Sequence, residues 1–414
     1  MPEMEAVTRT REDKEIRAAI IGAGGEALHT IRKAEEYGIT VIALDGNDQA
    51  EGLKEAHQPM VIDISREDRV LEVLRERRPH MLLTGPVGRW LTTMGAVNDA
   101  LQLPGVGREA AELCTDKWAF HLRLQKEGLR SCRCCLLSEK DPKVRKRAEK
   151  AVAEGLSFPA ILKPRFGSGS RSVFVLKNKE ALEEILAKWP DEEEDYVLEE
   201  CVTGREYGVD GAVIDGKFTM VLLRSKILTP PPVCQAVAYA SVLPEAPFWK
   251  EAKAYMEKVV AVLGLEECLL HADLIENEEG KPFGIEVSAR PSGHNLHNLF
   301  TPLCTGIDMA EQMIRHRLGL SAGFVPEKTK RMMIRYFDRK GKVVRVPSEE
   351  EVWLLTGESL AVWDCRLKEG DLLGDVTDGH SLMGRGCFIL EEQPSKELWT
   401  MSERVMDLFC LQVG

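Results

Sequence analysis

The chain has 414 residues and carries 55 Lys and Arg against 67 Asp and Glu, which gives a formal net charge of −12. Its hydrophobic fraction of 44% and charged fraction of 29% are typical of globular domains, so the composition excludes disordered and fibrous classes. At roughly 100–200 residues per domain, the length allows two to four domains. The acidic balance argues against nucleic-acid and anionic-lipid partners, but it is compatible with a local basic pocket for phosphate.

The sequence shows no sign of a membrane or export segment. No stretch approaches the roughly 18 consecutive apolar residues of a membrane span, and the opening residues have mixed charge without an apolar core. The eleven cysteines are scattered, and the tightest group (Cys132, Cys134 and Cys135) lacks both C-x-x-C spacing and a second ligand pair. We therefore expect a cytoplasmic protein without membrane contact, whose cysteines are buried thiols rather than zinc ligands.

The first hundred residues alternate short apolar runs with amphipathic stretches. This alternation predicts a parallel sheet with helices on its faces. The apolar runs are 18–21, 40–44, 60–62 and 81–83, and the clearest helical stretch is 66–77.

Glycines follow the first apolar run at Gly22, Gly24 and Gly25, and Asp45 ends the second run. This pattern is similar to a dinucleotide-binding fingerprint, in which glycines approach a pyrophosphate and an acid binds a ribose. The third glycine of that fingerprint is absent here. We therefore favour tight-turn glycines of a Rossmann-like scaffold over NAD binding.

A glycine loop between two expected strands is the most specific local signal. An apolar run over 158–162 leads to Lys163, and Gly167, Ser168, Gly169 and Ser170 follow before the next strand. Glycines let backbone N–H groups turn toward one anion, and a lysine at the end of the incoming strand adds a positive charge. The segment therefore predicts a phosphate site, with a flexible hairpin loop and a surface lysine as the alternative.

A second segment, over 195–206, places carboxylates at the end of an expected strand. Glu199 and Glu200 end an apolar run, and a glycine turn then leads to Glu206. Such a crossing between domains presents backbone groups and a carboxylate to a base and a ribose. The alternative is that Glu199 and Glu200 are exposed charges at a strand end.

The third segment is a hairpin over 269–289 that turns near Glu279 and Gly280. In a hairpin with a symmetric loop, opposed residues have a constant index sum, which places Asp273 directly across from Glu286. Paired strands hold such side chains roughly 5 Å apart at Cβ, where two carboxylates repel unless a divalent cation or a proton lies between them. The alternative, a solvent-facing charged hairpin, leaves unexplained the apolar residues between the acids, which imply that the opposite face is buried.

Period-two alternation extends this hairpin face along the second strand, where Glu286, Ser288 and Arg290 point to one side. A hard-cation site beside a phosphate-binding arginine is the arrangement that phosphoryl transfer requires. Farther along, short strands are expected over 332–337, 342–346 and 387–390, with a last helix from Ser395.

With these three segments in this order, the chain resembles the ATP-grasp superfamily, and it is most similar to the branch of L-amino-acid ligases such as bacilysin synthetase. The resemblance implies an ATP-grasp fold of α/β and α+β parts, with a Rossmann-like pre-grasp domain and a small C-terminal α+β subdomain. The implied domains are the pre-grasp domain 1–114, the small lobe with the glycine loop 115–203, the large lobe with the metal site 204–322, and the C-terminal subdomain 323–414.

The same resemblance implies roles for individual residues. Lys117 and Lys163 would hold ATP phosphates, and the loop Gly167–Ser170 (including Ser168 and Gly169) would close over them. Glu199, Glu200 and Val202 would form the adenine-binding hinge, and Glu206 would bind the ribose. Asp273 and Glu286 would coordinate Mg²⁺, or Mn²⁺ in its place. Arg290 and Lys163 would act in catalysis, and the substrate would be bordered by Ser288, Arg290, Gly293, His294 and Asn295.

Two positions depart from the pattern of that superfamily. Many members have an asparagine as a third metal ligand where this chain has Ser288, and a basic residue is common where this chain has Glu200. We expect a water or a phosphate oxygen to complete the metal shell at Ser288.

The resemblance implies an ATP-dependent carboxylate–amine ligase that releases ADP and phosphate through an acyl phosphate, acting on small amino acids. One alternative is a carboxylase or carbamoyl-phosphate-type enzyme that activates bicarbonate, and a purine-pathway ligase also fits the fold. Another is a nucleotide-binding regulatory protein without catalysis, which the joint presence of Lys163, Asp273, Glu286 and Arg290 disfavours. Expected partners are small-molecule substrates and a second copy of the chain in a homodimer.

Overall fold

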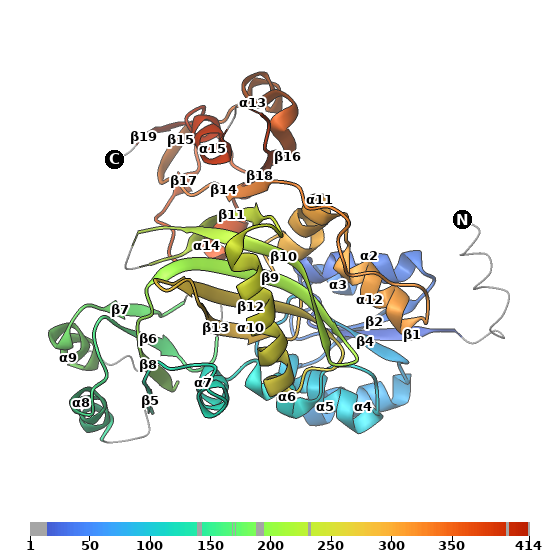
Figure 1. Ribbon diagram of the computed structural model, residues 1–414. Coiled ribbons are helices and arrows are strands. Elements are labelled where there is room, and N and C mark those ends of the chain that lie inside the picture. Colours follow the sequence, from blue (N-terminus) through green and yellow to red (C-terminus); the bar gives the residue numbers. More distant parts are fainter. Residues whose placement is uncertain are drawn as a thin grey trace.

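The computed structural model describes residues 15–138, 143–167, 169, 171–187, 194–230, 233–394 and 397–412. Across these residues the strands form four sheets. The largest sheet lies in the centre, and the N-terminal part, a small lobe and the C-terminal part surround it (Figure 1). Within the same residues, no helix combines the length and apolarity needed to cross a bilayer.

The N-terminal sheet is parallel, with strand order β3-β2-β1-β4, as the alternation of the sequence predicts. Asp45 closes the glycine turn, because its carboxylate accepts the backbone N–H of Ala23 at 2.7 Å and that of Asn47 at 2.8 Å. These bonds support the tight-turn interpretation of the glycines. The strands are β1 (Arg17–Ile21), β2 (Thr40–Asp45), β3 (Gln58–Val61) and β4 (Met81–Leu83). The helices are η1 (Gly25–Ala27), α2 (Leu28–Glu36), α3 (Glu51–Glu55), α4 (Glu67–Arg77), α5 (Leu91–Leu101) and α6 (Arg108–Leu113).

The small lobe is an antiparallel sheet with strand order β5-β8-β6-β7, and helix α7 (Lys117–Lys126) precedes it. Its apolar core joins the sheet to two helices that lie between its strands in sequence, α8 (Val144–Ala153) and α9 (Lys179–Ala187). The strands are β5 (Cys134–Leu137), β6 (Ala160–Pro164), β7 (Phe174–Leu176) and β8 (Tyr196–Glu200).

The central sheet has eight strands in the order β13-β12-β9-β10-β11-β14-β18-β16, all antiparallel to their neighbours. Three of the strands come from the tail of the chain, so the C-terminal part continues this sheet. The strands are β9 (Gly204–Ile214), β10 (Lys217–Leu228), β11 (Ala236–Val242), β12 (Cys268–Asn277), β13 (Pro282–Ser288), β14 (Met332–Tyr336), β16 (Leu360–Cys365) and β18 (Gly386–Glu391).

The two faces of this sheet differ in chemistry because successive side chains of a strand point to opposite sides. One face packs on helix α10 (Pro247–Leu263), with the Tyr207 ring 4.5 Å from the Phe248 ring and Ala272 fully buried. This buried face confirms the expectation drawn from the apolar residues between the acids of the hairpin. The other face carries polar and charged side chains, among them Glu206, Asp210, Arg224, Lys226, His271, Asp273 and Glu286.

The C-terminal part also carries a three-stranded sheet of order β17-β15-β19. The strands expected over 332–337, 342–346 and 387–390 are confirmed as β14, β15 and β18, whereas β16 and helix α13 were not anticipated. Ser395 lies outside the described residues, and the last helix is described from Leu398. The remaining elements are η2 (Leu296–Phe300), α11 (Thr301–Thr305), α12 (Met309–Arg317), α13 (Glu349–Thr356), η3 (Gly357–Ser359), α14 (His380–Met383), α15 (Leu398–Met406), β15 (Gly341–Arg345), β17 (Leu372–Leu373) and β19 (Cys410–Gln412).

The eleven cysteines are all among the described residues, and all are free thiols. Burial raises the pKa of Cys132 to about 12, so this thiol is a poor nucleophile at neutral pH. The expectation of buried cysteines holds for only four of the eleven, because six are partly exposed and Cys410 is exposed. The four buried ones are Cys132, Cys268, Cys304 and Cys387.

Gly204 sets the start of β9, where it pairs with Asn277 of β12. A Cβ at this position would lie 2.0 Å from the carbonyl oxygen of Glu276. We expect Gly204→Ala to destabilise the fold by about 1–3 kcal/mol, because the two strands must separate locally. Gly323→Ala is the matched control, since a Cβ there meets no atom within 4 Å. Equal thermal unfolding midpoints for the two variants would contradict this account of the register.

Candidate active site

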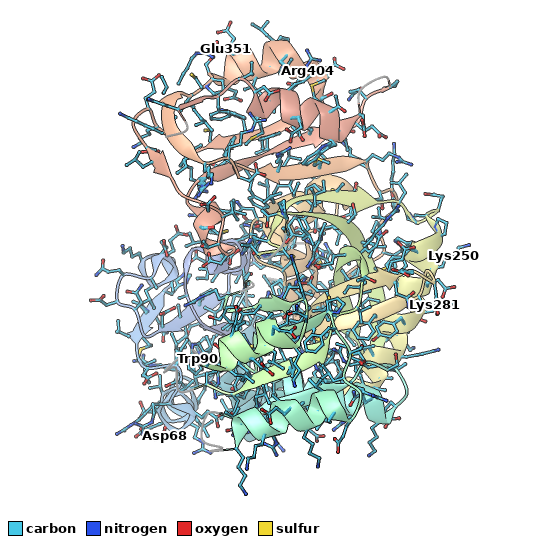
Figure 2. The ribbon with its side chains drawn as sticks, turned by 90° about the vertical axis from the view of Figure 1, so that its left-hand side faces the viewer. Asp68, Trp90, Lys250, Lys281, Glu351 and Arg404 are labelled. Atoms are coloured by element: carbon cyan, nitrogen blue, oxygen red, sulfur yellow. The ribbon has the colours of Figure 1, made fainter. Side chains whose placement is uncertain are left out.

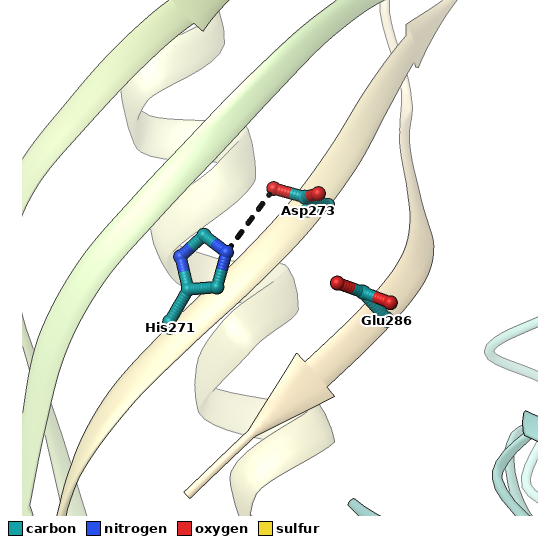
Figure 3. Close-up of side chains that lie close together, drawn as sticks. All are labelled: His271, Asp273 and Glu286. Atoms are coloured by element: carbon teal, nitrogen blue, oxygen red, sulfur yellow. Dashed lines mark ion pairs between the residues drawn. The ribbon is translucent and has the colours of Figure 1, made fainter. Parts of the chain in front are cut away.

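Two carboxylates face each other across β12 and β13. Asp273 pairs directly with Glu286, as the sequence predicts, and both side chains lie on the polar face of the sheet (Figure 3). The register of the hairpin shifts by one residue next to this pair, because Asp273 lies opposite Glu286 and Leu274 lies opposite Gly284. Ile285 is therefore the extra residue of a β-bulge, and the symmetric loop assumed from the sequence is wrong in detail.

His271 completes this cluster from β12, two residues before Asp273. One ligand atom from each of His271, Asp273 and Glu286 lies within 4.8 Å of the others, and Nε2 of His271 is 3.5 Å from Oδ1 of Asp273 (Figure 3). Sequence reasoning gave His271 no role. The spacing of His271 and Asp273 could have predicted this, because residues two apart on a strand share one face.

The donor set of this cluster fits a hard divalent cation. Burial alone would raise the pKa of Asp273, but the charge of Lys226 lowers it below its usual value, so the carboxylate stays charged. Burial lowers the pKa of His271, which keeps its imidazole neutral. Oδ2 of Asp273 lies 2.6 Å from Nζ of Lys226, whereas Oδ1 is buried and has no hydrogen-bond partner among the described residues. The two carboxylates suit Mg²⁺ or Mn²⁺, which prefer oxygen ligands, whereas the imidazole of His271 is a poor ligand for Mg²⁺.

Lys163 lies at the end of β6 in a buried network of charges. Its Nζ is 2.6 Å from Oε1 of Glu199, and both residues are at most 5% exposed. Oε2 of Glu199 is 2.6 Å from Arg130 and 3.1 Å from Nδ1 of His121. Lys163 is therefore not a surface lysine, and Glu199 is not an exposed charge at a strand end.

Arg130 connects this network to the hairpin of the large sheet. Its Nη2 donates to Glu199, and its Nη1 donates to the carbonyl oxygen of Gly284 at 2.6 Å, two residues before Glu286. The small lobe is thereby fixed against β13 by one buried guanidinium. Lys226 and Arg130 are two residues of this region that sequence reasoning did not single out.

The rest of the expected hinge is less buried. Glu200 accepts hydrogen bonds from the backbone N–H of Arg133 at 2.8 Å and from both the backbone N–H and hydroxyl of Ser157. Its carboxylate therefore holds two neighbouring segments together. Val202 lies in the connection between β8 and β9. Glu206 follows on β9, 3.6 Å from Nζ of Lys226, and burial raises its pKa.

Lys117 starts helix α7, and its Nζ donates to the carbonyl oxygen of Gly167 at 2.7 Å. Asp116 caps this helix and also accepts two hydrogen bonds from Arg165, at 2.9 and 2.6 Å, so the helix start is fixed beside the glycine loop. Ser168 and Ser170 of that loop lie outside the described residues.

A cavity of about 60 Å³ lies where the lobes meet. It joins Lys117 and Gly167 to the polar end of β13, so groups predicted for phosphate and for metal line one space. Lys163 is not among its lining residues, and it reaches this region through Glu199 and Arg130. The lining residues from the predicted site are Lys117, Gly167, Glu286, Ser288 and Arg290.

The segment after Arg290 lies where three parts of the chain meet. The backbone N–H of His294 donates to the carboxylate of Glu26 from the N-terminal part, and the Tyr336 hydroxyl donates to the carbonyl oxygen of His294. His294 and Asn295 both have left-handed backbone conformations, with φ of 61° and 58°. A π-helical turn, η2, follows directly, and such features concentrate at functional sites.

Two contacts bring further residues to this segment. A Cβ on Gly293 would lie 2.9 Å from the Glu26 carboxylate, so Gly293 allows close approach of the N-terminal part. The backbone N–H of Gly379, from the C-terminal part, donates to the carbonyl oxygen of Gly169 at 3.4 Å. The C-terminal part therefore touches the glycine loop directly. Glu26, Tyr336 and Gly379 belong to segments far apart in sequence and were not predicted.

Residues 156–297 match the ATP-grasp domain family. The L-amino acid ligase of Bacillus licheniformis is similar in structure, with a TM-score of 0.77 and 18% identity over 97% of this chain and 100% of that one. The ADP complex of an N5-carboxyaminoimidazole ribonucleotide synthetase gives a TM-score of 0.70 and 17% identity, covering 95% of this chain and 96% of that one. These similarities confirm the ATP-grasp fold that the sequence led us to expect.

A curated relative is the formate-dependent phosphoribosylglycinamide formyltransferase of Bordetella pertussis, 21% identical over 178 residues. The match covers 42% of this chain and 41% of that protein, so the chain spans about two fifths of the relative's length. The match to the ATP-grasp domain family is confined to residues 156–297, whereas the structural similarity extends over nearly the whole chain.

The buried Glu199 network generates a stability prediction. Glu199→Ala leaves Lys163 and Arg130 without their shared counter-charge, so we expect it to destabilise the protein by about 3–5 kcal/mol. Glu200→Ala is the matched neighbour, and its loss of partly exposed hydrogen bonds should cost about 1–2 kcal/mol. Urea denaturation followed by circular dichroism measures both. A smaller effect for Glu199→Ala than for Glu200→Ala would contradict the assignment of the network as the connection between lobes.

Proposed function

We propose that the chain is an ATP-dependent carboxylate–amine ligase that forms an amide bond through an acyl phosphate and releases ADP and phosphate. The observation that supports it best is the cavity shared by Lys117, the glycine loop, Glu286 and Arg290, next to the cluster of His271, Asp273 and Glu286. Groups that we assign to phosphate binding and to a cation line this one cavity. The similarity to an L-amino acid ligase supports small amino acids as substrates.

In this proposal a carboxylate oxygen of the acid attacks the γ-phosphorus of ATP, and the bond to ADP breaks. The nitrogen of a neutral amine then attacks the acyl carbon, and the C–O bond to phosphate breaks. A cation held by Asp273 and Glu286 would neutralise charge that develops on the phosphoryl oxygens. Arg290, which follows the end of β13, would stabilise the acyl phosphate on the same side of the sheet as Glu286.

The remaining predicted residues have places in this scheme. The lysines and the glycine loop bind phosphates, the hinge binds adenine and Glu206 binds the ribose. Contact between Gly379 and Gly169 supports closure of the site by the C-terminal part, which would keep water from the acyl phosphate. The nucleotide-binding residues are Lys117, Lys163, Gly167, Gly169, Glu199, Glu200, Val202 and Glu206.

A second candidate is activation of a one-carbon acid, bicarbonate or formate. The small volume of the cavity, about 60 Å³, favours it, and the curated relative is named as formate-dependent. Both candidates share the acyl phosphate and differ in the acid that accepts the phosphoryl group.

Phosphate release from ATP and Mg²⁺, measured with mass detection of the product, separates the candidates. The ligase predicts release that depends on a pair of small amino acids, whereas the second candidate predicts release that depends on bicarbonate or formate. Absence of phosphate release with any acid in the panel would overturn both and favour a nucleotide-binding protein without catalysis.

Removal of one metal carboxylate tests the mechanism directly. Glu286→Ala should reduce phosphate release by at least about 100-fold at an unchanged thermal midpoint, because one of two acidic cation ligands is lost. Glu279→Ala, at the exposed turn of the same hairpin, is the matched control and should leave turnover unchanged. Lys281 at that turn lies at the outer edge of the molecule, 3.1 Å from Glu251 (Figure 2). Native turnover by Glu286→Ala would remove the metal assignment.

A further inference from the structure

Arg224 is a buried arginine on the polar face of the central sheet. It is 0% exposed and comes from β10, two strands away from the candidate cation cluster. Its Nη2 donates to Oδ1 of Asp210 at 2.8 Å, but Nε and Nη1 have no hydrogen-bond partner among the described residues. Buried N–H groups of a charged side chain are costly to leave unpaired, so this arrangement indicates a ligand that accepts from them.

Asp210 holds Arg224 in place, and each of its two carboxylate oxygens accepts a hydrogen bond. Its second carboxylate oxygen accepts the hydroxyl hydrogen of Thr301 at 2.7 Å. The guanidinium also stacks over the ring of Tyr239, with its central carbon 5.2 Å from the ring centroid. The side chain is therefore fixed on two sides, and its free Nη1 is held in one direction before any ligand arrives.

Gly208 provides the space between Arg224 and the cation cluster. In the paired strands, Asp273 lies opposite Gly208, and Gly208 lies opposite Arg224. The guanidinium lies directly over this glycine, with Nη2 and Nη1 at 3.2 and 3.4 Å from the position a Cβ would occupy. The guanidinium therefore lies over β9, the strand next to Asp273, and neighbouring strands are about 4.8 Å apart.

Arg224 keeps two guanidinium nitrogens, Nε and Nη1, without a hydrogen-bond partner among the described residues, in addition to its pair with Asp210. Lys226, the next residue on the same face, is already paired with Asp273 at 2.6 Å and Glu206 at 3.6 Å. Arg290 donates through Nη1 to the carbonyl oxygen of Pro291, and its buried Nε has no described partner. Lys117 and the glycine loop lie on the opposite side of the cluster, at the β13 edge of the sheet.

We propose that Nη1 of Arg224 binds the carboxylate of the acid substrate, on the side of the candidate cation cluster away from the glycine loop. This assignment deepens and rests on the proposed ligase function. The position separates two anions: the nucleotide phosphates meet Lys117 and the glycine loop, and the acceptor carboxylate meets Arg224. Arg224 thereby selects a ligand with a carboxylate and orients one of its oxygens toward the γ-phosphoryl group.

Calorimetric titration without turnover tests this role. The probes are L-alanine, glycine and formate, each titrated into the full chain with Mg²⁺ and a non-hydrolysable ATP analogue. Arg224→Lys keeps a charge for Asp210 but removes the planar Nη1 donor. We expect at least tenfold weaker binding of the probe that the unmodified chain binds, with unchanged affinity for the nucleotide analogue.

Arg335→Lys is the matched control, because Arg335 is also a buried arginine of this sheet but donates through Nη1 to Ser402 and Glu403. It should leave carboxylate binding unchanged. Gly208→Ala is the second variant and decides the outcome if Arg224→Lys does not fold. Its new Cβ would lie 3.2 Å from the guanidinium and displace it without altering the charge. This variant should therefore also bind the probe more weakly.

Native carboxylate affinity in Arg224→Lys, or in Gly208→Ala where the lysine variant is unfolded, would overturn the assignment. Absence of binding of all three probes to the unmodified chain would overturn it as well. Either result leaves the ligase proposal standing if ATP is still turned over with an acid, so the two proposals fail independently.

Discussion

The alternation of side chains across the central sheet is the constraint on which the rest of this molecule depends. The face toward α10 is apolar and buried, so every charged residue of β9, β10 and β12 in the site must gather on the opposite face. Charges placed there are tolerated because partners from other strands of the sheet neutralise them, as Lys226 of β10 does for Asp273 of β12, across β9. Opposite charges also neutralise one another in the small lobe, where the buried Glu199 carboxylate pairs with both Lys163 and Arg130.

The local part of the site could be predicted from the sequence, and the long-range part could not. The pairing of Asp273 with Glu286 was predicted from a symmetric turn near Gly280, although the structure reaches it through a bulge at Ile285 that the sequence did not show. The apolar run before Lys163 was sufficient to place a strand there. The contact of Glu26 with His294 joins residues 268 positions apart, and no local pattern encodes it. Arg130 was missed for the same reason, since its two partners come from different sheets.

Other expectations keep their status as predictions. The boundaries 1–114, 115–203, 204–322 and 323–414 follow from the resemblance, and β14, β16 and β18 of the last segment extend the sheet of the one before it. A homodimer and a cytoplasmic location also stay predictions, because both concern the surroundings of the molecule. The ATP-grasp fold itself is confirmed.

The bulge at Ile285 has a consequence for how the length of this hairpin can vary. The turn pairs Asn277 with Lys281, and an unbroken ladder from that turn would place Ile285 opposite Asp273. The side chain of Glu286 would then point to the apolar face that packs on α10, and that of Val287 to the polar face of the sheet. The extra residue, Ile285, is what places the Glu286 carboxylate on the polar face. Insertions or deletions of a single residue in this turn should therefore be far less tolerated than substitutions. Length, more than residue identity, is what this turn must preserve.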